Sequence, residues 1–138
     1  MKRGFTLLEL IVVIIILGIL ATLGFTQYTK MIEKGRTAEA KMILGSLRTA
    51  EEAYKLEYGT YVVYTGGSAS LPVEAPTACA GTHYFSYGIT VAGAGATSTF
   101  TATATRCTAG GKTPNFAGTA YTVTLTNAGV WGGTAGYY

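Results

Sequence analysis

The 138-residue sequence contains no aspartate, a single histidine and two cysteines. Aspartate is a common ligand of hard cations, so its absence argues against a calcium or magnesium site. One histidine, His83, without a recognisable serine or cysteine nucleophile pattern, provides no set of residues for covalent or acid–base catalysis. We therefore expect no metal site, no cofactor and no enzymatic activity.

Charge is also scarce in the second half of the chain. After residue 58 the charged residues are Glu74, Arg106 and Lys112, and the formal net charge of the whole chain is +3. Two cations are too few for a convincing track of phosphate contacts. Nucleic acid is thus a possible but unsupported partner, whose binding would depend mainly on stacking by tyrosines and Trp131.

One long hydrophobic run lies near the N-terminus. Residues 5–25 carry a single charge, Glu9, and as a helix they would span about 31 Å, close to the thickness of a bilayer core. Lys2 and Arg3 on the short N-terminal flank predict that this end lies in the cytoplasm and the rest outside. A secretory signal peptide has a shorter apolar core and a small-x-small cleavage site, which this run matches poorly.

The helical pattern continues past the hydrophobic run. Residues 28–58 contain no proline and are amphipathic, and Gly59 follows where a helix cap is expected. At 100° per residue we expect a sheet-facing side and an opposite, charged side that is solvated or meets other subunits. The expected sheet-facing residues are Tyr28, Met31, Ile32, Gly35, Ala38, Met42, Ile43, Ser46, Ala50, Ala53 and Tyr54. The charged side comprises Lys30, Glu33, Lys34, Lys41, Arg48, Glu51, Glu52 and Lys55.

Alternating segments in the last third of the chain predict strands. They cover residues 84–91, 99–106 and 121–126, with a short fourth strand at 130–131. Glycine-containing turns separate them, which favours hairpins and an antiparallel sheet with one apolar face. The predicted fold class is α+β, with a long N-terminal helix whose amphipathic half packs on a four-stranded antiparallel sheet.

The first predicted hairpin brings the two cysteines to the same end of the sheet. Cys79 lies before the first strand and Cys107 follows the second. Both fall outside the apolar run, so the expected topology places them in an oxidising compartment. We predict a disulfide between them that has a structural and not a redox role.

Glu9 is the most informative residue of the hydrophobic run. A carboxylate five residues into a membrane helix is costly, so it indicates a partner unless it snorkels to the interface. Gly4 precedes Phe5, and Glu9 is the fifth residue after the glycine. The segment Lys2-Arg3-Gly4-Phe5-Thr6-Leu7-Leu8-Glu9 resembles, residue by residue, the prepilin signal of the type IV pilin family, which includes the pseudopilins of type II secretion. The chain is most similar to pilins of the type IVa kind.

The resemblance implies processing and assembly steps for these residues. It implies cleavage between Gly4 and Phe5 by a prepilin peptidase, and N-methylation of Phe5. It also implies that Glu9 pairs with the amino group of Phe5 on a neighbouring subunit and so sets the register of a filament. The pilin fold then divides the chain into a leader (1–4), a transmembrane and filament-core half-helix (5–29) and a globular domain (30–138). That domain comprises the helix 30–58, a loop 59–82 and a sheet 83–138.

Location and assembly partners also follow from the resemblance. It implies a prepilin in the inner membrane and then a homo-oligomeric helical filament outside the cell, built with an assembly platform and minor pilins. Many family members carry a proline late in the apolar half of the helix, where this chain has Gly24-Phe25-Thr26. We therefore predict that any unwinding of the helix on assembly falls between Gly18 and Gly24.

Three functions remain open at this stage. The first is a structural subunit of a type IV pilus, for attachment, motility or DNA uptake. The second is a major pseudopilin of a type II secretion system, although such proteins typically bind calcium through acidic C-terminal residues, and residues 112–138 contain no acid. The third is a minor pilin that binds DNA or acts as an adhesin. Aromatic residues along the helix are interpreted as packing and not as an electron-transfer path.

Overall fold

The computed structural model describes residues 4–65, 71–110, 112 and 120–138, and forms two compact units, Met1–Ile32 and Glu33–Tyr138. Lys2 and Arg3, and with them most of the predicted leader, lie outside the described residues. The helix α1 covers Leu7–Tyr58, and its N-terminal part is long and apolar enough to cross a membrane. It ends as predicted, because Gly59 has a φ of 75° and its N–H donates to the Lys55 carbonyl at 2.8 Å.

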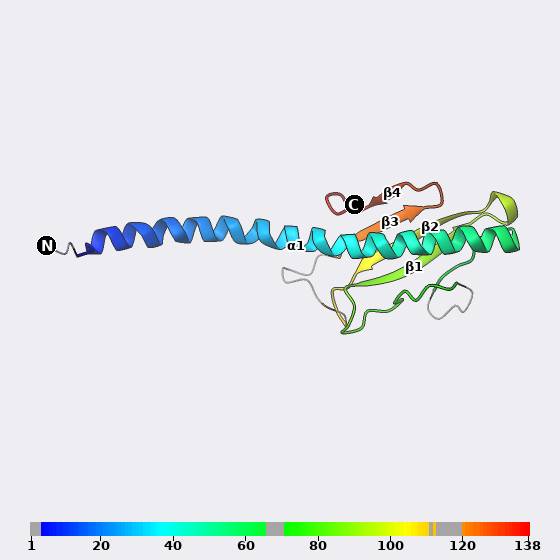
Figure 1. The fold of residues 1–138 in the computed structure, drawn as a ribbon, viewed down its shortest axis with the longest axis horizontal. Helices are drawn as coiled ribbons and strands as arrows, with labels where there is room; N and C mark the ends of the chain where they lie inside the picture. Colours follow the sequence, from blue (N-terminus) through cyan, green and yellow to red (C-terminus); the bar gives the residue numbers. More distant parts are fainter. Residues whose placement is uncertain (1–3, 66–70, 111, 113–119) are drawn as a thin grey trace. The chain divides into compact units, whose positions relative to one another are not determined.

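The remaining elements form one antiparallel sheet in the order β1-β2-β3-β4 (Figure 1). The strands are β1 Phe85–Ala92, β2 Thr99–Arg106, β3 Thr122–Thr126 and β4 Trp131–Gly133, and a short 3-10 helix, η1, covers Gly95–Thr97. Ile89 pairs with Ala102, Ala102 with Leu125, and Leu125 with Trp131. The predicted α+β class and four-stranded antiparallel sheet are confirmed.

The core lies between α1 and the sheet face on which it packs (Figure 1). Inward and outward side chains alternate along the strands as predicted, and threonine dominates the outward positions of β2 and β3. Burial of the inward apolar side chains drives this packing. The inward residues are Phe85, Tyr87 and Ile89 of β1, Phe100, Ala102 and Ala104 of β2, and Val123 and Leu125 of β3.

The predicted sheet-facing side of α1 is wrong. Of the predicted set only Ala50 is buried, Ile32, Ile43 and Tyr54 are half-buried, and Met42 is 68 % exposed. The row that packs on the sheet contains two glutamates that the prediction had placed on the charged side. They can be buried because polar groups of the core donate hydrogen bonds to their carboxylates. That row consists of Glu33, Thr37, Ala40, Leu44, Leu47 and Glu51.

Candidate functional site

The first turn of α1 is held by reciprocal hydrogen bonds between Thr6 and Glu9. The Thr6 N–H and hydroxyl donate to Oε2 of Glu9 at 3.0 and 2.9 Å, and the Glu9 N–H donates to Oγ1 of Thr6 at 3.3 Å. This is a capping box, which satisfies N–H groups that have no partner within the helix. The sequence signal for this motif is Thr6-Leu7-Leu8-Glu9, a threonine followed three residues later by a glutamate, which was not predicted as a cap.

The capping box gives Glu9 a role inside its own chain. A carboxylate at this position does not by itself require a partner from a second subunit, since it already accepts two hydrogen bonds from Thr6. The pairing of Glu9 with the amino group of a neighbouring Phe5 therefore stays a prediction, as do cleavage at Gly4 and methylation of Phe5. An experiment on Glu9 must separate helix capping from charge pairing.

The apolar part of α1 exposes its whole circumference. Every residue from Gly4 to Phe25 is exposed, with fractions that reach 85 % at Phe5. A helix that is apolar on all sides needs a lipid or protein environment around it. Gly18 and Gly24 lie within the helix, with open space where a Cβ would stand. Their predicted unwinding concerns an assembled filament and stays a prediction.

Within the unit Glu33–Tyr138, Arg106 is the centre of a buried polar network. The side chain of Arg106 is 0 % exposed, and that of Glu33 is 13 % exposed. Nε and Nη2 of Arg106 donate to the two carboxylate oxygens of Glu33 at 2.9 and 3.3 Å. The Tyr121 hydroxyl donates to Oε2 of Glu33 at 2.9 Å, and Arg36 forms a second ion pair with the same carboxylate. This network fixes α1 to β2.

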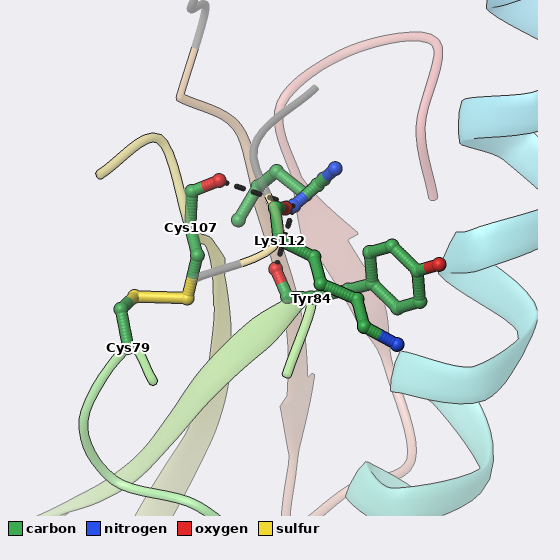
Figure 2. The surroundings of a disulfide bond; sticks show 5 residues. Cys79, Tyr84, Cys107 and Lys112 are labelled. Carbon is green, nitrogen blue, oxygen red and sulfur yellow. Dashed lines mark hydrogen bonds between the residues drawn. A yellow bond between two sulfur atoms is a disulfide. The ribbon is translucent and has the colours of Figure 1, made fainter. Parts of the chain in front are cut away.

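The same guanidinium also binds the loop that carries the disulfide (Figure 2). Nη1 of Arg106 donates to the carbonyls of Tyr84, Cys107 and Lys112 at 2.9, 3.1 and 2.5 Å. The predicted disulfide between Cys79 and Cys107 is confirmed. One buried cation therefore joins the helix, the residue before β1 and the segment after β2.

The pKa of Glu33 reflects two opposing effects. Burial of the carboxyl raises its pKa, but hydrogen bonds from Arg106 and Tyr121 and the charges of Arg106 and Arg36 outweigh burial, so the net shift is downward. Because Arg106 is buried and paired, it cannot contact phosphate. Arg106 and Lys112 are the two cations that follow residue 58 and that the sequence offered for binding nucleic acid. Of these two, Lys112 is exposed and Arg106 is not.

Glu51 is a second buried carboxylate of α1, near the end of the helix. It is fully buried, and its Oε2 accepts a hydrogen bond from the Val62 N–H at 3.0 Å. Its Oε1 has no hydrogen-bond partner within the described part of the chain. Burial is the main cause that raises the pKa of Glu51; the Val62 bond lowers it less, and the nearby Glu52 adds to the rise.

Replacing Glu51 by glutamine should remove a pH-dependent loss of stability. With a pKa raised above its usual 4.5, the folded state binds the Glu51 proton more tightly than the unfolded state. That contribution is complete below pH ~4.5 and is lost as the pH rises through the raised pKa. Glu51→Gln keeps the acceptor for Val62, so denaturant titrations from pH 4 to 8 should lose this downward slope. The exposed Glu57→Gln is the control, and an unchanged slope in Glu51→Gln would refute the assignment.

The disulfide should contribute a large share of the stability of this unit. Cys79 and Cys107 are separated by 28 positions, and on the chain-entropy model a closed loop of that length contributes about 3.5 kcal/mol. The double replacement Cys79→Ser and Cys107→Ser should lower the unfolding free energy by about this amount. Non-reducing mass spectrometry checks the bond itself, and free thiols in extracellular material would contradict it.

Four cations of α1 follow one side of the helix at intervals of seven residues. Arg48 donates through Nε to the Asn127 carbonyl at 3.2 Å, and the Lys41 ammonium lies 5.6 Å from the ring centre of Trp131, which is 38 % exposed. The helix thus brings positive charge to the β3–β4 edge of the sheet, a placement that was not predicted from the sequence. The four cations are Lys34, Lys41, Arg48 and Lys55.

Two family models match the sequence. One, described as type IV minor pilin ComP, DNA uptake sequence receptor, matches residues 26–115, more than half of the chain. The other, the prokaryotic N-terminal methylation motif, matches residues 1–25 and covers Gly4, Phe5 and Glu9.

Curated relatives match over part of the chain. The type II secretion system core protein G of Escherichia coli K12 is 42 % identical over 76 residues, which are 55 % of this chain and 52 % of that protein. The type IV major pilin protein PilA of Myxococcus xanthus is 39 % identical over 60 residues, 44 % of this chain and 27 % of PilA. The chain spans about half or less of the length of these relatives, and no solved structure gives a significant match.

Proposed function

Because the chain belongs to the type IV pilin family, we propose that it is a structural subunit of a type IV pilus. In this proposal the processed chain polymerises through its N-terminal helix into an extracellular filament. Pilins and pseudopilins are structural proteins and not enzymes, which agrees with the expectation from the composition.

The observation that carries the proposal is the exposed apolar surface of residues 5–25, which comprises Phe5 and the whole circumference of the N-terminal part of α1. In the membrane, lipid covers this surface. When the subunit leaves the membrane, exposure of the same surface to water would be strongly unfavourable. Packing of the helices of several subunits against one another keeps it buried, so polymerisation and membrane extraction are coupled.

Fibres sheared from cells that express the protein test this function. Mass spectrometry should find chains that begin at an N-methylated Phe5, and electron microscopy should show filaments that are lost when the gene is deleted. Fibres without this protein in wild-type cells would reject the role of a pilus subunit. Recovery only in the envelope fraction, dependent on a secretion system, would support a pseudopilin like core protein G instead.

A second candidate function is a DNA-receptor minor pilin. Two observations favour it: the family model over residues 26–115, and the exposed Trp131 beside Lys41, with Arg48 hydrogen-bonded to Asn127 between β3 and β4. A stacking aromatic next to cations is the arrangement that single-stranded or frayed DNA requires. The edge is small, so we expect weak and strongly salt-dependent binding.

The variant Lys41→Ala with Trp131→Ala tests the DNA-binding edge. We expect it to weaken retardation of DNA by the full chain in detergent by about tenfold or more, since one stacked base is worth about 1–3 kcal/mol. Loss of one phosphate contact should also lower the salt slope by about one. Lys112→Ala, a cation that lies beside Tyr84, is the matched control. Equal loss in the control would indicate non-specific charge binding.

A further inference from the structure

A hydroxyl-lined groove lies on the sheet face that points away from α1. Its cavity volume is about 540 Å³, and its floor is formed by outward residues of β1 and β2, with Tyr64 and Thr65 on one side. The segment at Tyr64 is fixed beside β1, because Tyr64 and Ile89 exchange two backbone hydrogen bonds at 3.0 and 3.2 Å. The volume falls within the range of roughly 300–1,000 Å³ that is typical of small-ligand sites.

Gly88 creates the hollow in the floor of this groove. It occupies the middle of β1, pairs in regular register with Thr103, and has no positive φ. A Cβ there would meet only the Tyr64 carbonyl, at 3.5 Å, which is an ordinary contact. Neither a bulge, nor a special backbone conformation, nor a clash requires glycine, although glycine inside a strand costs stability. Glycines inside strands also mark places where a ligand or another backbone approaches closely; at Gly88 the Tyr64 carbonyl lies on one side, and the rest of the position is open among the described residues.

The groove provides hydroxyl groups and no charge. Ser86, Thr103 and Thr105 on the floor are half-buried, and their hydroxyls have no protein hydrogen-bond partner in the part of the chain that the structure describes. Among the described residues that line the groove there is no lysine, arginine, histidine or carboxylate. A hydroxyl both donates and accepts, so a row of them fits a ligand whose own groups do the same. An anion or a cation would find no opposite charge there.

We propose that this groove binds a neutral carbohydrate. Sugar hydroxyls would pair with Ser86, Thr103 and Thr105, and the C–H face of the ring would lie on the threonine methyl groups and the bare backbone of Gly88. The site belongs to a single subunit, so it does not depend on the pilus function proposed above. It would give the unit Glu33–Tyr138 an affinity for uncharged glycans.

Saturation-transfer NMR on the full chain, in a detergent without a sugar head group, tests the proposal. The probes are glucose, galactose, mannose, N-acetylglucosamine and their β-linked disaccharides, with sialic acid as the charged comparison. We expect at least one neutral probe to bind. Thr103→Val should weaken it about 2- to 10-fold, which corresponds to one lost hydrogen bond. Gly88→Val should abolish binding by filling the hollow.

The matched control is Thr124→Val, which changes the same residue type on the same sheet face. Thr124 pairs with Thr103 across the sheet but does not line the groove. Thermal unfolding verifies that each variant is folded, and Thr103→Val carries the test if Gly88→Val does not fold. Absence of binding by every neutral probe would overturn the proposal. Preference for sialic acid, or an equal effect of Thr103→Val and Thr124→Val, would also overturn it.

Discussion

Replacing Arg106 by methionine should lower the free energy of unfolding by about 3–5 kcal/mol, the usual result of removing one partner of a buried ion pair. The change removes both hydrogen bonds that Arg106 donates to the mostly buried Glu33, and it removes the donor that Arg106 supplies to three backbone carbonyls of the disulfide region. Urea titration of the full chain in detergent at pH 7 measures the loss. A loss below 1 kcal/mol would show that Arg106 is not essential to the network.

A variant that also changes Glu33, the ion-pair partner of Arg106, makes this test more specific. The double variant Arg106→Met with Glu33→Leu removes both charges, so it should be less destabilised than the sum of the two single variants. Arg36→Met is the control, because Arg36 pairs with the same carboxylate but its side chain is 17 % exposed, against 0 % for Arg106. We expect it to cost about 1 kcal/mol or less. Strict additivity in the double variant would contradict a shared network.

The Arg106 network also predicts a dependence on acid. The pKa of Glu33 in the folded protein lies below its usual value, so the folded state releases the proton more readily than the unfolded state. The resulting stability is complete above pH ~4.5 and is lost as the pH falls through the lowered pKa. In Arg106→Met this acid-dependent part of the stability should shrink.

The alternation of buried and exposed residues along β2 correctly predicts that Arg106 points inward, but it does not predict the partner of Arg106. The pattern Phe100, Ala102, Ala104 in β2 predicts the inward face correctly, and the next residue with the same parity is Arg106. Parity thus placed this arginine in the core, but its charge led us to count it among the surface cations. Its partner could not be deduced, because the contact with Glu33 joins residues 73 positions apart.

The face of α1 failed for a related reason. Small and apolar residues occur all around the helix, and the prediction assigned the charged residues, Glu33 and Glu51 among them, to the side opposite the sheet. The buried row begins at Glu33 and ends at Glu51, and its large aliphatic residues are Leu44 and Leu47. The free energy gained by burying the leucines outweighs the cost of desolvating two carboxylates, because Arg106, Tyr121 and the Val62 N–H donate hydrogen bonds to them.

Patterns with a strictly local cause were predicted best. The end of α1 at Gly59, the bounds of β2 and the disulfide follow from a cap, an alternation and a hairpin. The last strand, β4, is displaced by one to two residues because two of its three residues are glycines, which have little strand preference. At Gly133 a Cβ would lie 2.2 Å from the Thr122 carbonyl. The pairing of β4 with β3 therefore depends on a close approach of the two backbones that only glycine permits at this position.

Glu9→Gln should separate the two roles of this residue in filament assembly. Glutamine can occupy the same position of a capping box, so the hydrogen bonds with Thr6 and the helix start should persist. It cannot neutralise an amino group of a neighbouring Phe5. If charge pairing sets the register, filament yield by shearing should fall at least about tenfold, because an unpaired buried amine costs several kcal/mol.

Thr6→Ala makes the complementary change, since it removes the hydroxyl of the capping box and keeps the charge of Glu9. Loss of a cap costs about 0.5–2 kcal/mol of helix stability, which lipid or neighbouring helices around the apolar segment can offset. We therefore expect filaments from Thr6→Ala and very few from Glu9→Gln. A normal filament yield from Glu9→Gln together with a low yield from Thr6→Ala would contradict charge pairing. It would mean that Glu9 stabilises the start of the helix and that other contacts set the register of the subunits in the filament. Membrane fractionation of both variants ensures that the yields compare equal amounts of inserted subunit.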